Sequence, residues 1–334
     1  MKVLVTGGGG FLGRAIVEGL RERGDKVHTF QRSACPDLES RGVECFRGDL
    51  SCRDMLARAM AGCEVVFHVA AKVGIWGEFR DFYRTNVVGT RNVLELCNRF
   101  GMAKLVYTSS PSVVFSGHDD QGLDQSAPYP KRYLSPYAET KALAEQLVLG
   151  ANHPRFATIA LRPHLIWGPG DPHLVPRILK GARAGRLRLV GSGQNLVDST
   201  YIDNAVLAHL LAADRVAAGA PCAGKAYFVT NGEPLPIGEL MRKILRAAAL
   251  PPEIPSIPPS VAYSVGAILE KLHRLLRLSG EPLVTRFVAR ELATAHWFDI
   301  SATRRDLGYE PAISIDEGLD RLACSLRSSA LGVP

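Results

Sequence analysis

The chain has 334 residues, of which 46% are hydrophobic and 22% are charged. This length and composition indicate a globular protein with a substantial core, and they exclude disordered, collagen-like and disulfide-stapled chains. The 40 lysines and arginines exceed the 33 aspartates and glutamates by seven, a modest excess that favours an anionic ligand. Because the chain has no aromatic-plus-basic motif, we expect no nucleic-acid partner.

The seven cysteines are odd in number and form no C-x-x-C pair. They predict free thiols in a reducing cytoplasm, with neither a disulfide framework nor a metal site. The N-terminus lacks the pattern of a signal peptide, and no segment has the roughly 18 apolar residues of a membrane span. We therefore expect a cytoplasmic protein.

Short apolar segments alternate with segments of helical spacing in the first half of the chain. The expected strands are 2–6, 26–30, 43–48, 64–70, 104–109 and 156–162, and the expected helices are 11–23, 51–61, 79–100 and 135–150. Because the strands are apolar throughout, the alternation predicts an α/β fold with a doubly wound parallel sheet of the Rossmann type, covered on both faces.

The second half is punctuated by proline and glycine and is less regular. One more sheet strand is expected at 225–230, and helices are expected at 236–249, 260–278, 283–294 and 314–325. We infer a dinucleotide-binding domain from 1–162 with 196–230. The remainder, 163–195 with 231–330, is expected to form a smaller, mostly helical substrate lobe.

The segment TGGGGFLG lies between the first expected strand and the first expected helix. Gly7 permits the tight turn, Gly10 lets the backbone approach a pyrophosphate, and Gly13 lets the helix pack closely on the strand. The pyrophosphate would meet free N–H groups at the start of the helix, at Phe11 and Leu12. This strand–loop–helix context predicts a dinucleotide site rather than a flexible loop.

The second strand ends in Gln31 and Arg32, where an acidic residue usually holds the adenosine ribose. A carboxylate would repel a 2′-phosphate, whereas Arg32 can pair with one in a bidentate manner. We therefore predict NADPH in preference to NADH, the alternative being that Arg32 is only a solvated cation. Further contacts with the cofactor are expected from Asp49, Leu50, Ala70, Ala71 and Lys72.

Tyr137 and Lys141 share one face near the start of the expected helix 135–150. The ammonium of Lys141 would lower the pKa of Tyr137, so that the phenol could exchange a proton with a substrate oxygen near neutral pH. Ser110 ends the fifth strand, at the sheet edge where α/β folds bind ligands, and can hydrogen-bond the same oxygen. Ser109 is the neighbouring candidate, and a simple surface pair of tyrosine and lysine is the alternative interpretation.

With the segments NVVGT (86–90) and LRPHLIWGPGD, these motifs make the chain similar to the extended short-chain dehydrogenases/reductases over nearly all of its length. The resemblance implies that Ser110, Tyr137 and Lys141 are catalytic and that Lys141 also holds the nicotinamide ribose. It further implies that Asn86 lies near the active site and that Pro163 lies beside the nicotinamide.

The same resemblance implies a homodimer through a four-helix bundle built from 79–100 and 135–150. Within the superfamily, LRPHLIWGPGDPHLVPRIL and NLVDSTYIDNAVLAHLLA resemble the 3β-hydroxysteroid dehydrogenase branch. PYAETKALAEQLVLGAN and AGKAYFVTNGEPLP are most similar to the bacterial 2-alkyl-3-oxoalkanoate reductases of olefin biosynthesis. Val197-Asp198 replaces the Arg-Asp pair usual in nucleotide-sugar epimerases, which argues against a UDP-sugar substrate.

The resemblance thus implies an NADPH-dependent reductase of a carboxylate-bearing, apolar substrate, associated with other enzymes of the olefin pathway. A 3β-hydroxysteroid or sterol-4α-carboxylate 3-dehydrogenase is the first alternative, and a non-catalytic dinucleotide sensor is the second. The segment 260–278 is rich in aliphatic residues and ends in basic ones. It predicts a wall of the substrate lobe, a peripheral contact with anionic lipid, or a core-packing amphipathic helix.

Overall fold

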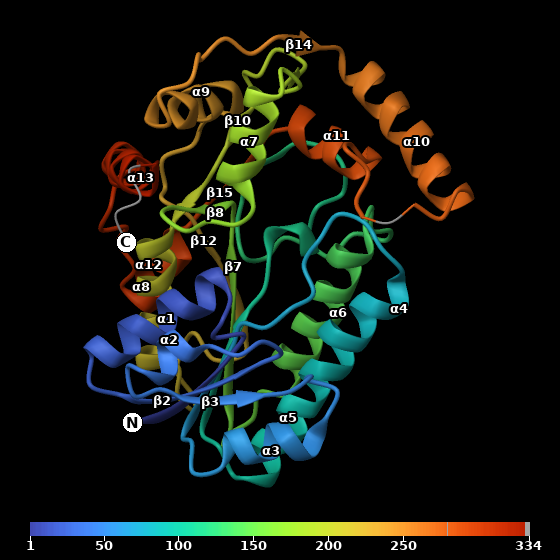
Figure 1. Ribbon diagram of the computed structural model, residues 1–334. Coiled ribbons are helices and arrows are strands. Elements are labelled where there is room, and N and C mark those ends of the chain that lie inside the picture. The colour runs from blue at the N-terminus through green and yellow to red at the C-terminus, as the bar shows by residue number, and fades with distance from the viewer. Residues whose placement is uncertain (279, 331–334) are drawn as a thin grey trace.

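A seven-stranded parallel sheet forms the centre of the computed structural model, which describes residues 1–278 and 280–330 (Figure 1). Its order is β12-β7-β5-β4-β1-β2-β3, and every neighbouring pair is parallel. The strands are β1 (Lys2–Thr6), β2 (Lys26–Gln31), β3 (Glu44–Arg47), β4 (Val65–His68), β5 (Lys104–Thr108), β7 (Ala157–Pro163) and β12 (Lys225–Val229). All seven strands expected from the sequence are confirmed, as is the Rossmann-type fold.

Helices cover both faces of this sheet. Helices α1 (Phe11–Glu22) and α8 (Ile202–Arg215) pack on one face, and α3 (Arg53–Met60), α5 (Gly89–Arg99) and α6 (Pro136–Gly150) pack on the other. Successive side chains of a strand point to opposite faces, so Val3 and Val5 join the first core and Leu4 joins the second. Burial on both faces explains why the strands are apolar without alternation.

The segment 79–100, expected as one regular helix, is interrupted. It consists of α4 (Phe79–Phe82), a π-helix (Tyr83–Val88) and α5. A π-helix places an extra residue in one turn, which shifts the side chains that follow, and such turns are frequent at functional sites. Asn86 lies in this turn.

A smaller lobe lies beyond the carboxyl ends of the strands. Its helices are α7 (Leu174–Arg183), α9 (Ile237–Ala247), α10 (Pro259–Leu275) and α11 (Arg286–Ala293). It also holds a four-stranded sheet of β13 (Leu235–Pro236), β10 (Leu196–Val197), β15 (His296–Phe298) and β6 (Asp120–Leu123), which the sequence did not predict. Strands of two to four residues have too few positions to show an alternating pattern.

The smaller sheet takes strands from both sides of the expected domain division, because β6 lies within 1–162 and β10 within 196–230. The remaining elements are α2 (Pro36–Glu39), a 3₁₀ turn (Pro111–Val113), β8 (Ile166–Trp167), β9 (Leu189–Val190), β11 (Thr200–Tyr201), β14 (Ser256–Ile257), α12 (Ser301–Leu307) and α13 (Ile315–Ala330). Helix α8 was also missed, although its alanines and leucines recur with helical spacing.

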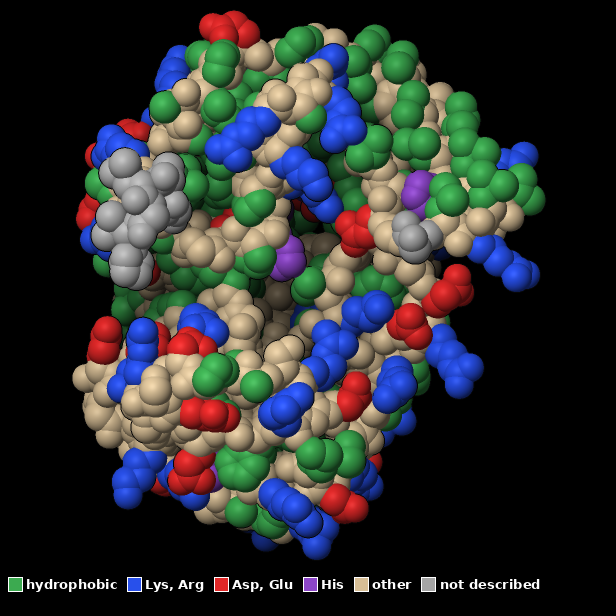
Figure 2. Space-filling view, in the orientation of Figure 1, with side chains coloured by type: hydrophobic (Ala, Val, Ile, Leu, Met, Phe, Trp, Pro, Cys, Tyr) green, Lys and Arg blue, Asp and Glu red, His purple; other side chains and the backbone are tan. Residues whose placement is uncertain are grey.

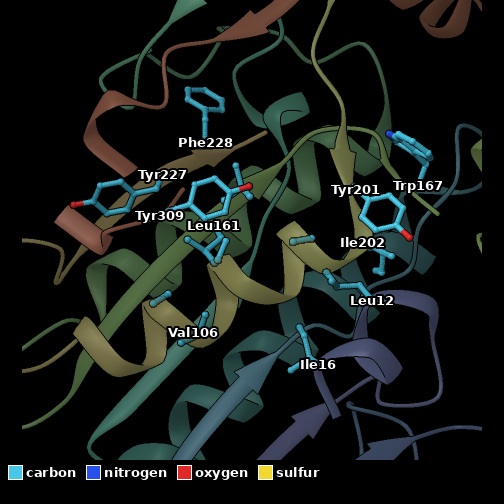
Figure 3. Close-up of a cluster of buried hydrophobic side chains, with 14 of the residues drawn as sticks. Leu12, Ile16, Val106, Leu161, Trp167, Tyr201, Ile202, Tyr227, Phe228 and Tyr309 are labelled. Carbon is cyan, nitrogen blue, oxygen red and sulfur yellow. The ribbon is translucent and has the colours of Figure 1, made fainter. Parts of the chain in front are cut away.

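One hydrophobic core connects the sheet to the smaller lobe (Figure 3). Ile16 of α1, Val106 of β5 and Leu161 of β7 belong to it beneath α8. It continues into the lobe through the edge-to-face pair of Trp167 and Tyr201 and through stacked rings of Phe228 and Phe298, whose centroids lie 4.2 Å apart. Close packing across the junction fixes the walls of the cavity between the two parts.

Candidate active site

The strand order reverses between β1 and β4, which is where open α/β sheets leave a crevice for a ligand. Two positions require glycine here, one in the turn after β1 and one in the first turn of α1. Gly7 has a φ of +75°, and a Cβ there would lie 2.9 Å from the Ala70 backbone, which follows β4. A Cβ on Gly13 would lie 2.1 Å from the Gly7 carbonyl oxygen, so only glycine lets α1 approach the loop this closely.

A cavity of about 550 Å³ opens from this crevice, and Figure 2 shows the surface hollowed between the two parts of the molecule. Most of the predicted site residues line it: Gly7, Gly10, Phe11, Leu12, Gly13, Gln31, Arg32, Asp49, Leu50, Ala70, Ala71, Ser110, Tyr137, Lys141 and Pro163. Residues from seven different regions of the chain therefore converge on one space.

Two predicted contacts, Lys72 and Asn86, do not line this cavity. The Asn86 side chain accepts from the Lys72 backbone N–H at 2.7 Å, and its amide donates to the Lys72 carbonyl and to the Thr140 hydroxyl at 3.0 Å. Asn86 thus ties the loop after β4 to α6, which carries Tyr137 and Lys141. Its position indicates support of the site rather than contact with a ligand, because its polar atoms are already paired.

Several polar groups along the cavity lack partners among the described residues. Gln31 is buried, yet neither its amide oxygen nor its amide nitrogen has a hydrogen-bond partner, and the same holds for the Ser109 hydroxyl. No side chain caps the start of α1, because Gly10 occupies the N-cap position. Orphaned polar atoms and free helix N–H groups fit a polar, phosphate-bearing ligand, so these residues suit a dinucleotide.

Lys141 is almost completely buried, and its ammonium nitrogen is held by two contacts. It donates to the Thr108 carbonyl at 2.6 Å and lies 4.1 Å from the centre of the Tyr107 ring. Burial lowers the pKa of Lys141 to about 7, since the charged form loses its hydration, while Glu145 acts in the opposite direction. The Lys141 amine can therefore gain or lose a proton near neutral pH.

The expected lowering of the Tyr137 pKa is not found. Burial raises the pKa of Tyr137 to about 12, outweighing a hydrogen bond with Ser110 that favours the phenolate. Lys141 is not among the groups that shift this pKa. At neutral pH the phenol keeps its proton, which suits a group that donates one.

Ser110 and an unexpected acid stand near this phenol. The Ser110 hydroxyl caps the 3₁₀ turn after β5, accepting from the Ser112 N–H and lying 2.9 Å from the Ser112 hydroxyl. Glu291 of α11 acts on Tyr137 through its charge and raises the Tyr137 pKa further. The pKa of Glu291 is itself raised by burial. No local motif marks Glu291, which is why the sequence did not identify it.

Apolar cavity residues also escaped prediction. Leu165, Ile166 and Leu174 come from the segment after β7, and Val73 from the loop after β4. Isolated aliphatic residues carry no chemical signal in a sequence, so only the fold can place them at a site.

A model of the 3-beta hydroxysteroid dehydrogenase/isomerase family matches residues 4–256. The chain belongs to this family. The 2-alkyl-3-oxoalkanoate reductase of Stenotrophomonas maltophilia is 53% identical over 327 residues, covering 97% of this chain and 99% of the relative. The human sterol-4-alpha-carboxylate 3-dehydrogenase, decarboxylating, is 37% identical over 328 residues, covering 97% of this chain and 87% of the relative.

Solved structures agree on the fold of this 3-beta hydroxysteroid dehydrogenase family member. MoeE5, solved with UDP-glucose and NAD, has a TM-score of 0.75 at 26% identity, covering 99% of this chain and all of that one. The UDP-glucose 4-epimerase of Thermotoga maritima has a TM-score of 0.77 at 21% identity and similar coverage. The chain is thus an extended short-chain dehydrogenase/reductase, an oxidoreductase that acts on hydroxyl or keto groups with a nicotinamide dinucleotide.

Proposed function

We propose that the protein reduces the 3-keto group of a 2-alkyl-3-oxoalkanoate to a hydroxyl group, with NADPH as the reductant. One observation carries this proposal. Ser110, Tyr137 and Lys141 meet at a cavity in a chain that is 53% identical, over nearly its whole length, to a protein named 2-alkyl-3-oxoalkanoate reductase. These three side chains are not needed for binding a dinucleotide alone, which argues against a non-catalytic sensor.

The chemistry divides between the ligand and the chain. When bound, the reduced nicotinamide supplies a hydride to the ketone carbon. Tyr137 donates its phenolic proton to the ketone oxygen, and Ser110 holds that oxygen by a hydrogen bond. The hydrogen bond with Ser110 favours the phenolate that remains. Lys141, buried beside Tyr107 with a pKa of about 7, would hold the nicotinamide ribose and return a proton to the site near neutral pH. The glycine loop and the start of α1 would hold the pyrophosphate, and Gln31 and Arg32 would hold the adenosine end.

A sterol-4α-carboxylate or 3β-hydroxysteroid dehydrogenase is the second candidate, favoured by the relatives at 37% identity. The proton-transfer residues would be the same, with the phenol accepting the proton in the oxidative direction. A UDP-sugar substrate is not proposed, because Val197 stands where nucleotide-sugar epimerases usually have arginine.

A side-by-side assay separates these candidates. We expect NADP-dependent oxidation of a racemic 2-alkyl-3-hydroxyalkanoate to exceed oxidation of a 3β-hydroxysteroid in kcat/KM, because the closer relatives carry the first substrate in their name. Both substrates are assayed at matched concentrations with the same enzyme preparation. A higher kcat/KM for the steroid would replace the first candidate with the second.

Arg32 supports the choice of NADPH. It is exposed at the cavity beside the unpaired amide of Gln31. Across the same site, hydrogen bonds from Ser51 lower the pKa of the Asp49 carboxyl, and the Arg32 charge lowers it a little further. Replacing Arg32 with glutamate removes a charge-assisted bond to the 2′-phosphate, worth about 1.5–3 kcal/mol, and adds repulsion. We expect kcat/KM for NADPH to fall at least about tenfold and that for NADH to fall little.

The matched control is Arg58→Glu, an equal change of charge at an exposed site on α3. Steady-state kinetics of the wild type, Arg32→Glu and Arg58→Glu with NADPH and with NADH would test this prediction. A wild-type kcat/KM for NADH equal to or above that for NADPH, or an unchanged NADPH value in Arg32→Glu, would contradict the role of Arg32.

We also propose a homodimer through a bundle of 79–100 and 135–150 and association with other olefin-pathway enzymes, both on the basis of the family resemblance. A cytoplasmic location is proposed from the seven free cysteines. A peripheral membrane contact through 260–278 is a separate proposal that does not depend on the reaction. Among residues 1–278 and 280–330, no helix is long and apolar enough to cross a bilayer.

A further inference from the structure

Helix α10 presents its large apolar side chains to solvent and its small ones to the protein. Ala262, Gly266 and Glu270 form the buried face, one turn apart. A Cβ on Gly266 would lie 2.8 Å from the Thr285 backbone, so this face packs tightly against the start of α11. The opposite face carries Val261, Val265, Ile268, Leu272, Leu275 and Leu276, which are between 40% and 73% exposed.

These six side chains, here called the α10 ridge, follow one another at helical spacing and form a single stripe. Leu278 and Leu283 extend the apolar surface beyond the helix. Figure 2 shows hydrophobic side chains gathered along the edge of the molecule where α10 lies in Figure 1. Isolated exposed leucines are ordinary, but a continuous apolar stripe over four turns reverses the usual amphipathic pattern and indicates a covering partner.

The exposed charges of α10 and of the residues that follow it up to 278 are all positive. Glu270 is the only acid in 259–278, and it is buried and paired with Arg286 at 2.8 Å. Lys271, Arg274 and Arg277 are exposed at the carboxyl end of the ridge. Aliphatic side chains flanked by cations complement an anionic lipid surface, where the chains enter the interface and the cations meet phosphate groups.

A protein partner fits the ridge less well. A single helix with six apolar side chains falls far short of the roughly 20–30 residues per side that a stable protein–protein interface uses. None of the six ridge side chains is aromatic, whereas aromatic anchors dominate such interfaces. The neighbouring rings of Tyr263 and Trp76 are each covered on one face by a guanidinium, from Arg290 at 5.1 Å and from Arg274 at 5.2 Å.

The carboxyl end of the ridge adjoins the mouth of the cavity. Trp76, in the loop after β4, packs edge-to-face on His273 and lies under the Arg274 guanidinium at 5.2 Å. The Glu281 carboxylate accepts from the Ile75 N–H at 3.1 Å and pairs with Arg177 of α7. In the same loop Val73 lines the cavity and is half exposed. A surface that covers the ridge would therefore also face this loop.

We propose that α10 docks the protein on an anionic lipid bilayer, with the loop 72–78 and the cavity mouth turned toward the membrane. Docking would bring the cavity to the phase in which a substrate with long alkyl chains is concentrated, a consequence that rests on the proposed function. The docking itself does not depend on that function, so the two can fail separately.

Vesicle flotation of the full chain tests the docking. We expect the wild-type protein to float with vesicles that contain phosphatidylglycerol, less with phosphatidylcholine alone, and less again at high salt. Leu275→Glu should lower the partition coefficient about tenfold or more, because a leucine that would enter the bilayer interface is replaced by a charge. Lys271→Glu should weaken binding to the anionic vesicles only. Met55→Glu and Arg58→Glu, exposed sites on α3, are the matched controls and should float like the wild type.

Reductase activity on a water-soluble short-chain substrate is measured on every variant. Two results would overturn the docking and leave the enzyme assignment intact. One is a wild-type protein that reduces the short-chain substrate but does not float; the other is an active Leu275→Glu variant that floats as well as the wild type. A wild-type dimer that Leu275→Glu converts to monomers, without flotation, would assign the ridge to a second copy and also overturn it. Flotation that Leu275→Glu loses, without activity on any substrate, would support the docking and count against the proposed function.

Discussion

Replacing Tyr137 with phenylalanine is expected to lower kcat by about 10²- to 10⁴-fold, because the ketone oxygen loses its proton donor. The phenol lines the cavity and has a pKa of about 12, so it carries the proton at neutral pH. Nucleotide affinity should stay close to that of the wild type, since the glycine loop, Gln31 and Arg32 are untouched. Steady-state kinetics and fluorescence titration with NADPH measure the two quantities.

Tyr133→Phe provides the matched control for this prediction. Tyr133 lies four residues earlier, and burial raises its pKa as well. It does not line the cavity. Loss of its hydroxyl should leave kcat nearly unchanged. If Tyr137→Phe retained kcat similar to that of Tyr133→Phe, the proton-transfer role of Tyr137 would be wrong.

Replacing Glu145 with leucine is expected to cost about 3–5 kcal/mol of the free energy of unfolding. Glu145 of α6 and Arg162 of β7 form a bidentate ion pair, at 2.6 and 3.0 Å, and both side chains are almost completely buried. The Tyr129 hydroxyl donates to the same carboxylate at 2.7 Å. Removing the acid leaves the buried Arg162 charge without its partner and without water, and this accounts for most of the lost stability.

Urea denaturation of two further variants completes this test. Glu95→Leu breaks the exposed pair of Arg53 and Glu95 and should cost less than about 1 kcal/mol. The double variant Glu145→Leu/Arg162→Met removes both buried charges and should recover much of the loss. Equal unfolding midpoints for Glu145→Leu and Glu95→Leu would show that the buried pair contributes little.

The features that sequence could predict are those with a local physical signature. The glycine loop was predictable because Gly7 and Gly13 each meet a steric requirement that no other residue satisfies. The seven strands were predictable because parallel strands buried on both faces are apolar throughout. Ser110, Tyr137 and Lys141 were predictable as a group because each stands at a sheet edge or helix start that the fold directs toward one crevice.

The features that escaped prediction depend on contacts between distant segments. Glu291 reaches the site from a helix about 150 residues after Tyr137, and no spacing rule connects them. The direction of the Tyr137 pKa shift depends on how deeply Tyr137 and Lys141 are buried, which a sequence does not give. The sequence also could not predict whether the α10 ridge is exposed, because the same aliphatic pattern occurs in helices that pack in a core.

Isotope transfer tests the central claim most directly. NADPH deuterated at nicotinamide C4 is incubated with the protein and a 2-alkyl-3-oxoalkanoate, and the product is examined by mass spectrometry and NMR. We predict a 2-alkyl-3-hydroxyalkanoate with deuterium at C3, formed from one face of the nicotinamide only, and a loss of nearly all product with Tyr137→Phe. A wild-type protein that binds the nucleotide and leaves C3 unlabelled would contradict the account.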